Sequence, residues 1–111
     1  MPGISIHVVD VSRGVIASGM KVELYGPERR LIVSGVTNAK GLIEVDSAVP
    51  PGVYEALFHV AAWYRSHGVS LPGVPFLDVV RYGFGVSDSS QHYHLPFKCT
   101  PWGYSCFRGG A

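Results

Sequence analysis

Glycine and proline interrupt this chain so often that they leave little room for long helices. Fourteen glycines and eight prolines occur among 111 residues, and they separate short runs that are rich in Val, Ile, Phe and Tyr. Such punctuation is typical of an all-β domain with frequent turns. We therefore predict a two-sheet β-sandwich of about eight strands with one short helix. The expected strands cover residues 4–9, 20–25, 31–36, 42–45, 53–58, 76–84, 91–98 and 104–108.

Local signals place the helix and two hairpins. Residues 59–67 form a run of helix-tolerant residues without Gly or Pro, and the Gly68 that follows suits a helix C-terminus. The turn residues of Thr37–Gly41 predict a hairpin between the strands on either side of them. A second hairpin is expected to turn at Thr100–Gly103.

Size and charge exclude several classes of function. A chain of 111 residues fits one domain, here residues 1–111. Nine Lys and Arg balance eight Asp and Glu, so bulk charge gives no reason to expect a nucleic acid or a membrane surface as partner. No apolar run approaches the ~18 residues of a membrane span, and the first residues lack the pattern of a secretion signal. We expect a soluble cytoplasmic protein.

Histidines near the two ends of the chain are the candidates for chemistry. His7 lies in the first expected strand, and His92 and His94 share one face of the seventh because strands have a period of two. An imidazole titrates near neutral pH and suits a general acid or base. Two alternatives stay open: a packed or surface pair without chemistry, and a three-imidazole zinc site if the fold brings His7 close.

The two cysteines are Cys99 and Cys106. We expect reduced thiols, as is usual inside cells, although a disulfide across the last hairpin stays open. Cys106 as a nucleophile is a weaker hypothesis, because Arg108 is the one evident positive neighbour.

The C-terminal segment 92–110 reads HYHLPFKCTPWGYSCFRGG. It resembles the signature of the transthyretin-like family of 5-hydroxyisourate hydrolases, in which HYHxP is followed by SPxxYSTYRGS. The resemblance continues upstream, in order and with the family's spacing. The matching segments are Ile6–Asp10, Thr37–Gly41, Gly52–Glu55 and Pro75–Val80.

The resemblance implies a transthyretin-like sandwich that assembles as a homotetramer, with active sites at the dimer–dimer interface. Hydrolases of the family open the 5-hydroxyisourate ring at an amide carbonyl during urate breakdown, a part of purine metabolism. The product is 2-oxo-4-hydroxy-4-carboxy-5-ureidoimidazoline. The family's histidines correspond to His7 and His94, an acid/base pair, and its tail arginine corresponds to Arg108, an electrostatic clamp. His92 is expected to line the cleft, and we expect no metal or cofactor.

Three positions expected to contact the substrate depart from the family pattern. The family's Arg is Leu42 here, its Tyr is Phe107, and its terminal Ser is Gly110. Leucine offers no charge and no donor to an oxyanion, so the cleft wall is less polar than in the family. The leading interpretation is a hydrolase of a small cyclic amide or ureide, headed by 5-hydroxyisourate. The alternatives are a related enzyme acting on another cyclic substrate in specialised metabolism, and a non-catalytic small-molecule binder.

Overall fold

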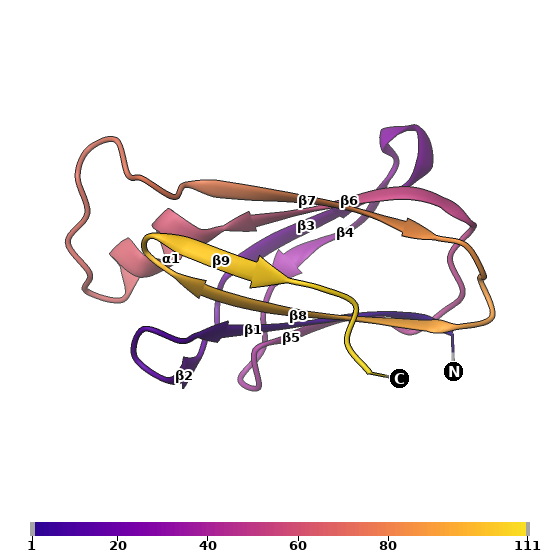
Figure 1. Ribbon diagram of the computed structural model, residues 1–111, viewed down its shortest axis with the longest axis horizontal. Coiled ribbons are helices and arrows are strands. Elements are labelled where there is room, and N and C mark those ends of the chain that lie inside the picture. Colours follow the sequence, from indigo (N-terminus) through magenta and orange to yellow (C-terminus); the bar gives the residue numbers. More distant parts are fainter. Residues whose placement is uncertain (1, 111) are drawn as a thin grey trace.

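Two β-sheets stack face to face in the computed structural model, which describes residues 2–110 (Figure 1). The first sheet, sheet A, has the strand order β2-β1-β8-β9, and β5 also pairs with β1. Its strands are β1 (Gly3–Asp10), β2 (Val15–Ile16), β5 (Leu42–Val45), β8 (His92–Thr100) and β9 (Gly103–Cys106). The second, sheet B, has the order β4-β3-β6-β7. Its strands are β3 (Lys21–Tyr25), β4 (Leu31–Val36), β6 (Gly52–His59) and β7 (Val79–Val86).

The core lies between the sheets, and period-two alternation selects its residues. In β8 the side chains of Tyr93, Leu95 and Phe97 are buried. His92 and His94 occupy alternate positions and face away from the core. Phe97 stacks on Phe58 of β6 across the sandwich, with ring centroids 3.8 Å apart. Each fully buried side chain of this size contributes roughly 1.5–3 kcal/mol of transfer free energy. The same alternation leaves a half-exposed face on the other side of sheet A.

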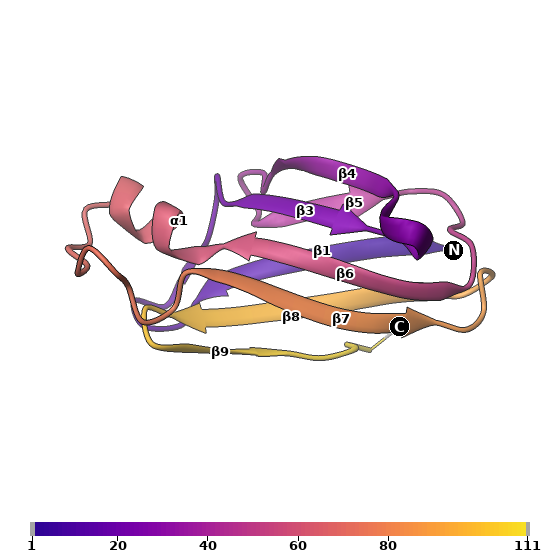
Figure 2. The same cartoon turned by 90° about the horizontal axis from the view of Figure 1, so that it is seen from above.

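The predicted short helix is present. It is α1 (Val60–Ser66), which lies at one end of the sandwich directly after β6 (Figure 2). Gly68 has a φ of 80°, the left-handed conformation expected after a helix. A 3-10 turn, η1 (Pro27–Arg29), also forms before β4 and was not predicted. None of the helices among residues 2–110 is long and apolar enough to cross a membrane.

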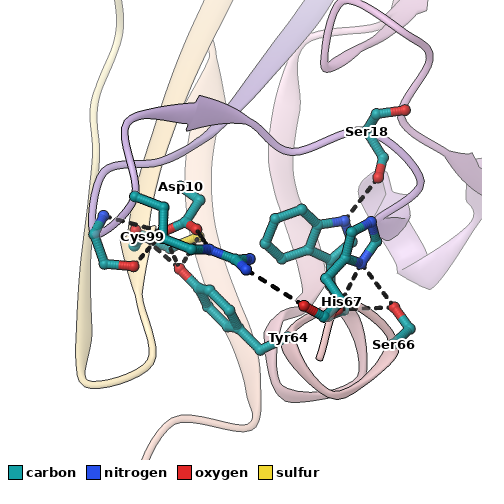
Figure 3. A network of polar contacts seen from close by, with 9 residues as sticks. Asp10, Ser18, Tyr64, Ser66, His67 and Cys99 are labelled. Atoms are coloured by element: carbon teal, nitrogen blue, oxygen red, sulfur yellow. Dashed lines mark hydrogen bonds and ion pairs between the residues drawn. The ribbon is translucent and has the colours of Figure 1, made fainter. Parts of the chain in front are cut away.

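A buried polar network fixes α1 against the end of β1 (Figure 3). The hydroxyl of Tyr64 donates to Asp10, whose side chain is fully buried, over 2.6 Å. Arg13 binds the same carboxylate through Nε at 2.8 Å. Burial raises the pKa of Asp10, but hydrogen bonds from Ser12, Tyr64 and Arg13 outweigh burial and hold the pKa below its ordinary value. The buried carboxylate is therefore ionised, and the Arg13 guanidinium and the hydrogen bonds balance its negative charge.

The hairpin predicted at residues 37–41 is wrong. β4 pairs with β3 in sheet B, whereas β5 pairs with β1 in sheet A, so the segment carries the chain from one sheet to the other. The turn chemistry itself is present, because Asn38 Oδ1 accepts hydrogen bonds from the backbone of Lys40 and Leu42. Thr37 explains the crossing: its buried hydroxyl donates to the Ala17 carbonyl at 2.6 Å and anchors the segment to the β2–β3 connection.

Several other boundaries differ from expectation by one to three residues. The strand expected at 104–108 is observed as β9 and ends at Cys106, so residues 107 and 108 belong to the tail. The strand expected at 76–84 is observed as β7 and begins three residues later, because residues 76–78 belong to the loop after α1. β2 was not predicted, since two residues are too short for an alternation pattern. The hairpin of β8 and β9 is confirmed, with Thr100 opposite Gly103.

Candidate active site

The outer face of sheet A gathers the sequence-predicted histidines. β1 and β8 pair in parallel, so the first and last parts of the chain lie side by side (Figure 1). The register sets Ser5 opposite His94 and His7 opposite Pro96. On the other edge of β1, His7 lies opposite Leu42 of β5. His7 and His94 are therefore diagonal neighbours on one face of the sheet.

Ser5 joins the two histidines of β8. Its Oγ lies 2.8 Å from Nε2 of His92 and 2.6 Å from Nδ1 of His94. The serine is only 6% exposed, so its hydroxyl is largely shielded from solvent. We name Ser5, His7, His92 and His94 the histidine cluster. Sequence reasoning missed Ser5, although its position two residues before His7 on the same strand places both on one face.

His94 has the electrostatics of a base that is neutral at neutral pH. Burial lowers the pKa of its imidazole below the ordinary value of 6.5. The nearby His7 and His92 lower that pKa further, because a positive charge on either disfavours another on His94. A neutral imidazole keeps one ring nitrogen free to accept a proton.

Leu42 forms an aliphatic wall beside His7. It is half-buried and lies directly across the β1–β5 ladder from that histidine. The buried Gly41 before it passes so close to β1 that a Cβ there would lie 2.7 Å from the Val8 carbonyl oxygen. Glycine thus lets β5 begin next to His7, and Leu42 gives that edge of the cluster an apolar surface.

The C-terminal tail passes over His94. The amide of Gly109 donates to the His94 carbonyl at 2.7 Å. A Cβ on Gly109 would lie 2.9 Å from Cδ2 of the His94 ring and 3.0 Å from Cγ of Pro96. This contact is closer than a side chain allows, so only glycine lets the tail lie against the imidazole.

Arg108 takes a different direction from the one expected. Its Nη2 donates to Oε1 of Gln91 at 3.0 Å and to the His92 carbonyl at 3.3 Å, and its guanidinium lies 4.1 Å from the centroid of the Tyr93 ring. The side chain thus follows β8 and reaches the histidine cluster only at the backbone of His92.

The two remaining expected contact residues also lie on the tail. Phe107 is 45% exposed, and its ring centroid is 5.7 Å from Nζ of Lys98. Gly110 is exposed, with open space where a Cβ would stand. The structure does not bring these two residues into contact with the imidazoles.

The metal and thiol alternatives find no support in the geometry. Within residues 2–110, no group of three or more His, Cys, Asp or Glu side chains is arranged to hold a metal ion. Both cysteines are free, and in the β8–β9 ladder Cys99 faces Tyr104 while Cys106 faces Phe97. Burial raises the pKa of each thiol to about 11, so neither is a thiolate nucleophile at neutral pH.

A model of the HIUase/Transthyretin family matches residues 4–109. The chain belongs to this family. It is 43% identical to the 5-hydroxyisourate hydrolase of Deinococcus radiodurans, over 97% of the chain and 96% of that protein. Membership confirms the family resemblance that the segment beginning HYHLP indicates.

Solved structures agree with the HIUase/transthyretin assignment. The crystal structure of (S)-allantoin synthase has a TM-score of 0.88 at 30% identity, and the match covers 97% of the chain but only 43% of the synthase. Transthyretin from Sparus aurata has a TM-score of 0.81 at 23% identity, covering 96% of the chain and 95% of that protein. The predicted transthyretin-like sandwich is confirmed.

Proposed function

We propose that this HIUase/transthyretin family member is a hydrolase that opens a small cyclic amide or ureide ring, with 5-hydroxyisourate as its leading substrate. One observation carries the proposal. His7 and His94 lie on one face of adjacent strands, in a chain that matches a 5-hydroxyisourate hydrolase over nearly its full length. In this proposal residues 1–111 form one domain. The protein acts in the cytoplasm and needs no metal or cofactor.

The histidine pair supplies the proton transfers. His94, neutral because its pKa is lowered, takes a proton from water as the water oxygen attacks the amide carbonyl. The carbonyl π electrons move to oxygen and give a tetrahedral oxyanion. When the oxyanion collapses, the ring C–N bond breaks and the leaving nitrogen takes a proton from His7, the acid of the pair. The proton held by His94 then replaces the one that His7 gave up, and both imidazoles return to their starting states. The carbon keeps the water oxygen as a carboxylic acid.

Arg108 is the group proposed to stabilise the oxyanion. Its guanidinium already contacts the His92 carbonyl, and its other partners are the exposed side chain of Gln91 and the ring of Tyr93. Release from Gln91 frees the guanidinium to reach the carbonyl oxygen of a substrate lying on the histidine cluster. Stabilising charge that develops only in the transition state is the part of binding that raises kcat. Phe107 and Gly110 complete the substrate contacts from the same tail.

Leu42 supports a second candidate function. An aliphatic side chain beside His7 favours a less polar ring than 5-hydroxyisourate, and it removes a donor where the family pattern has Arg. A relative acting on another cyclic substrate, or a binder without turnover, follows if the remaining groups cannot stabilise the oxyanion. The family domain also occurs within (S)-allantoin synthase, a longer protein.

Assembly as a homotetramer is part of the proposal, with the histidine cluster at the dimer–dimer interface. Large apolar side chains are exposed at the other end of sheet A and on the loops and tail that adjoin it. They are Val11, Val15, Ile16, Trp102, Tyr104 and Phe107, with exposures of 45–61%. Burial of these side chains against another chain would favour association.

The decisive assay follows the ultraviolet absorbance of freshly generated 5-hydroxyisourate. We expect the wild type to accelerate its decay and His94→Ala to lose the general-base contribution, about 100-fold or more. The exposed Ser34→Ala in sheet B serves as the control and should match the wild type. Decay at the spontaneous rate with wild-type protein refutes the urate-pathway assignment, and binding of a cyclic amide without turnover then supports the carrier.

A further inference from the structure

Ser5 connects two imidazoles through one hydroxyl, and that arrangement restricts where their protons lie. Its Oγ is within hydrogen-bond distance of His92 Nε2, at 2.8 Å, and of His94 Nδ1, at 2.6 Å. A hydroxyl has one proton to donate and lone pairs to accept with. The hydroxyl has no third hydrogen-bond partner within residues 2–110, so Ser5 donates to one imidazole and accepts from the other.

His94 consequently has only one ring nitrogen available for chemistry. Nδ1 is occupied by Ser5 in either arrangement, so Nε2 is the atom that can meet water or substrate. If Ser5 donates to His92, then His94 carries its proton on Nδ1 and presents a bare Nε2, which is a base. If Ser5 donates to His94, then Nε2 carries the proton and cannot accept another.

Only the arrangement in which Ser5 donates to His92 keeps the same hydrogen bonds before and after the proton transfer. After Nε2 takes a proton, both ring nitrogens of His94 are donors, so Ser5 must accept from Nδ1 and must donate to His92. The first arrangement has these hydrogen bonds already. The second requires the hydroxyl to turn during the reaction, which a preorganised site avoids.

We propose that Ser5 is a positioning residue that holds His94 in the tautomer protonated on Nδ1, with Nε2 of His92 accepting a hydrogen bond from the Ser5 hydroxyl. This inference rests on the proposed hydrolase function, and it assigns Ser5 and His92 a role that acts through His94. A hydroxyl buried between two imidazoles serves the reaction by keeping Nε2 of His94 bare.

His92 controls the direction of the Ser5 hydroxyl. When His92 Nε2 accepts the hydrogen bond from Ser5, the Ser5 proton points away from His94, and the Ser5 oxygen is left to accept from His94 Nδ1. The other titratable or charged groups around this pair are His7 on β1, Glu44 opposite Ser5 on β5, and Arg108 at the His92 carbonyl.

The first test reads the tautomer directly and does not depend on catalysis. In ¹⁵N-labelled wild-type protein at neutral pH, the ring-nitrogen chemical shifts of His94 should show a protonated Nδ1 and a bare Nε2. Ser5→Ala should convert His94 to a mixture of tautomers, whereas Ser5→Thr, which keeps the hydroxyl, should retain the wild-type shifts. A wild-type His94 protonated on Nε2 overturns the proposal, whatever the activity of the protein.

The second test is kinetic. Ser5→Ala should lower kcat by about 10–100-fold with little change in KM, as is typical when the partner that orients an imidazole is lost. Ser5→Thr should restore most of kcat, and Ser34→Ala is the control at an exposed serine of sheet B. A kcat for Ser5→Ala equal to that of the wild type overturns the role of Ser5. If the wild type hydrolyses no cyclic amide, the proposed function fails, and the tautomer measurement alone decides the inference.

Discussion

Tyr64→Phe should destabilise the protein measurably although it removes a single oxygen atom. The hydroxyl donates to the buried Asp10 carboxylate at 2.6 Å and thereby joins α1 to β1. A hydrogen bond to a charged group contributes about 1.5–3 kcal/mol. At about 4 °C per kcal/mol for a chain of this size, Tm should fall by about 6–12 °C.

The pH dependence of this loss follows from the Asp10 carboxyl. Its folded-state pKa is lowered below the ordinary value of 3.8, so its stabilising contribution is present above that value and is lost as pH falls through the folded-state pKa. Tyr64 is one of the groups that lower this pKa. The difference in Tm between the wild type and Tyr64→Phe should therefore narrow at acid pH.

Thermal melts followed by circular dichroism, at one protein concentration and a series of pH values, measure both effects. Tyr82→Phe is a matched control, because Tyr82 is half-buried and its hydroxyl makes no hydrogen bond within residues 2–110. Equal losses of Tm in the two variants, or a Tyr64→Phe difference that stays constant with pH, would refute the hydrogen-bond argument.

Three further predictions concern the histidine cluster. Leu42→Arg should raise turnover of 5-hydroxyisourate by up to about 100-fold, since it restores a donor beside His7, and unchanged turnover would contradict our account of Leu42. Gly109→Ala should lower kcat by about 10–100-fold because its Cβ displaces the His94 ring, whereas Gly85→Ala, in open space, should not; equal kcat values would exclude this displacement. In a kcat/KM–pH profile, which reports the free enzyme, activity should fall with acid through a pKa below 6.5 because the base must be neutral, and an acid limb at or above 6.5 would argue against His94 as the base.

Most strands could be predicted from the sequence because a half-buried strand alternates. In β8 the alternation of His92, Tyr93, His94 and Leu95 identifies both the strand and the two histidines on its outer face. The strands with which β4 and β5 pair could not be predicted in the same way, because β4 joins β3 in sheet B and β5 joins β1 in sheet A. The residues after β4 do form a turn. The chain then crosses to the other sheet, because the buried Thr37 hydroxyl binds the carbonyl of Ala17, a contact that no local pattern in the sequence reveals.

The candidate site was only partly accessible to sequence reasoning. No local pattern says that β1 and β8 pair in parallel, and Ser5 contacts residues 87 and 89 positions away. The proximity of His7 to His94 came from the family resemblance. The direction of Arg108 depends on its contacts with Gln91 and the Tyr93 ring, which a list of matching motif positions does not contain.

The parallel pairing of β1 with β8 also determines when the histidine cluster can form during synthesis of the chain. A growing polypeptide that has left the ribosome only as far as sheet B holds Ser5 and His7 but neither of the other two imidazoles. β8, the strand that completes the cluster, follows every strand of sheet B in the chain, and its pairing with β1 joins residues that are 87 and 89 positions apart. With the proposed function, the chain therefore stays inactive until β8 has been synthesised and has paired with β1.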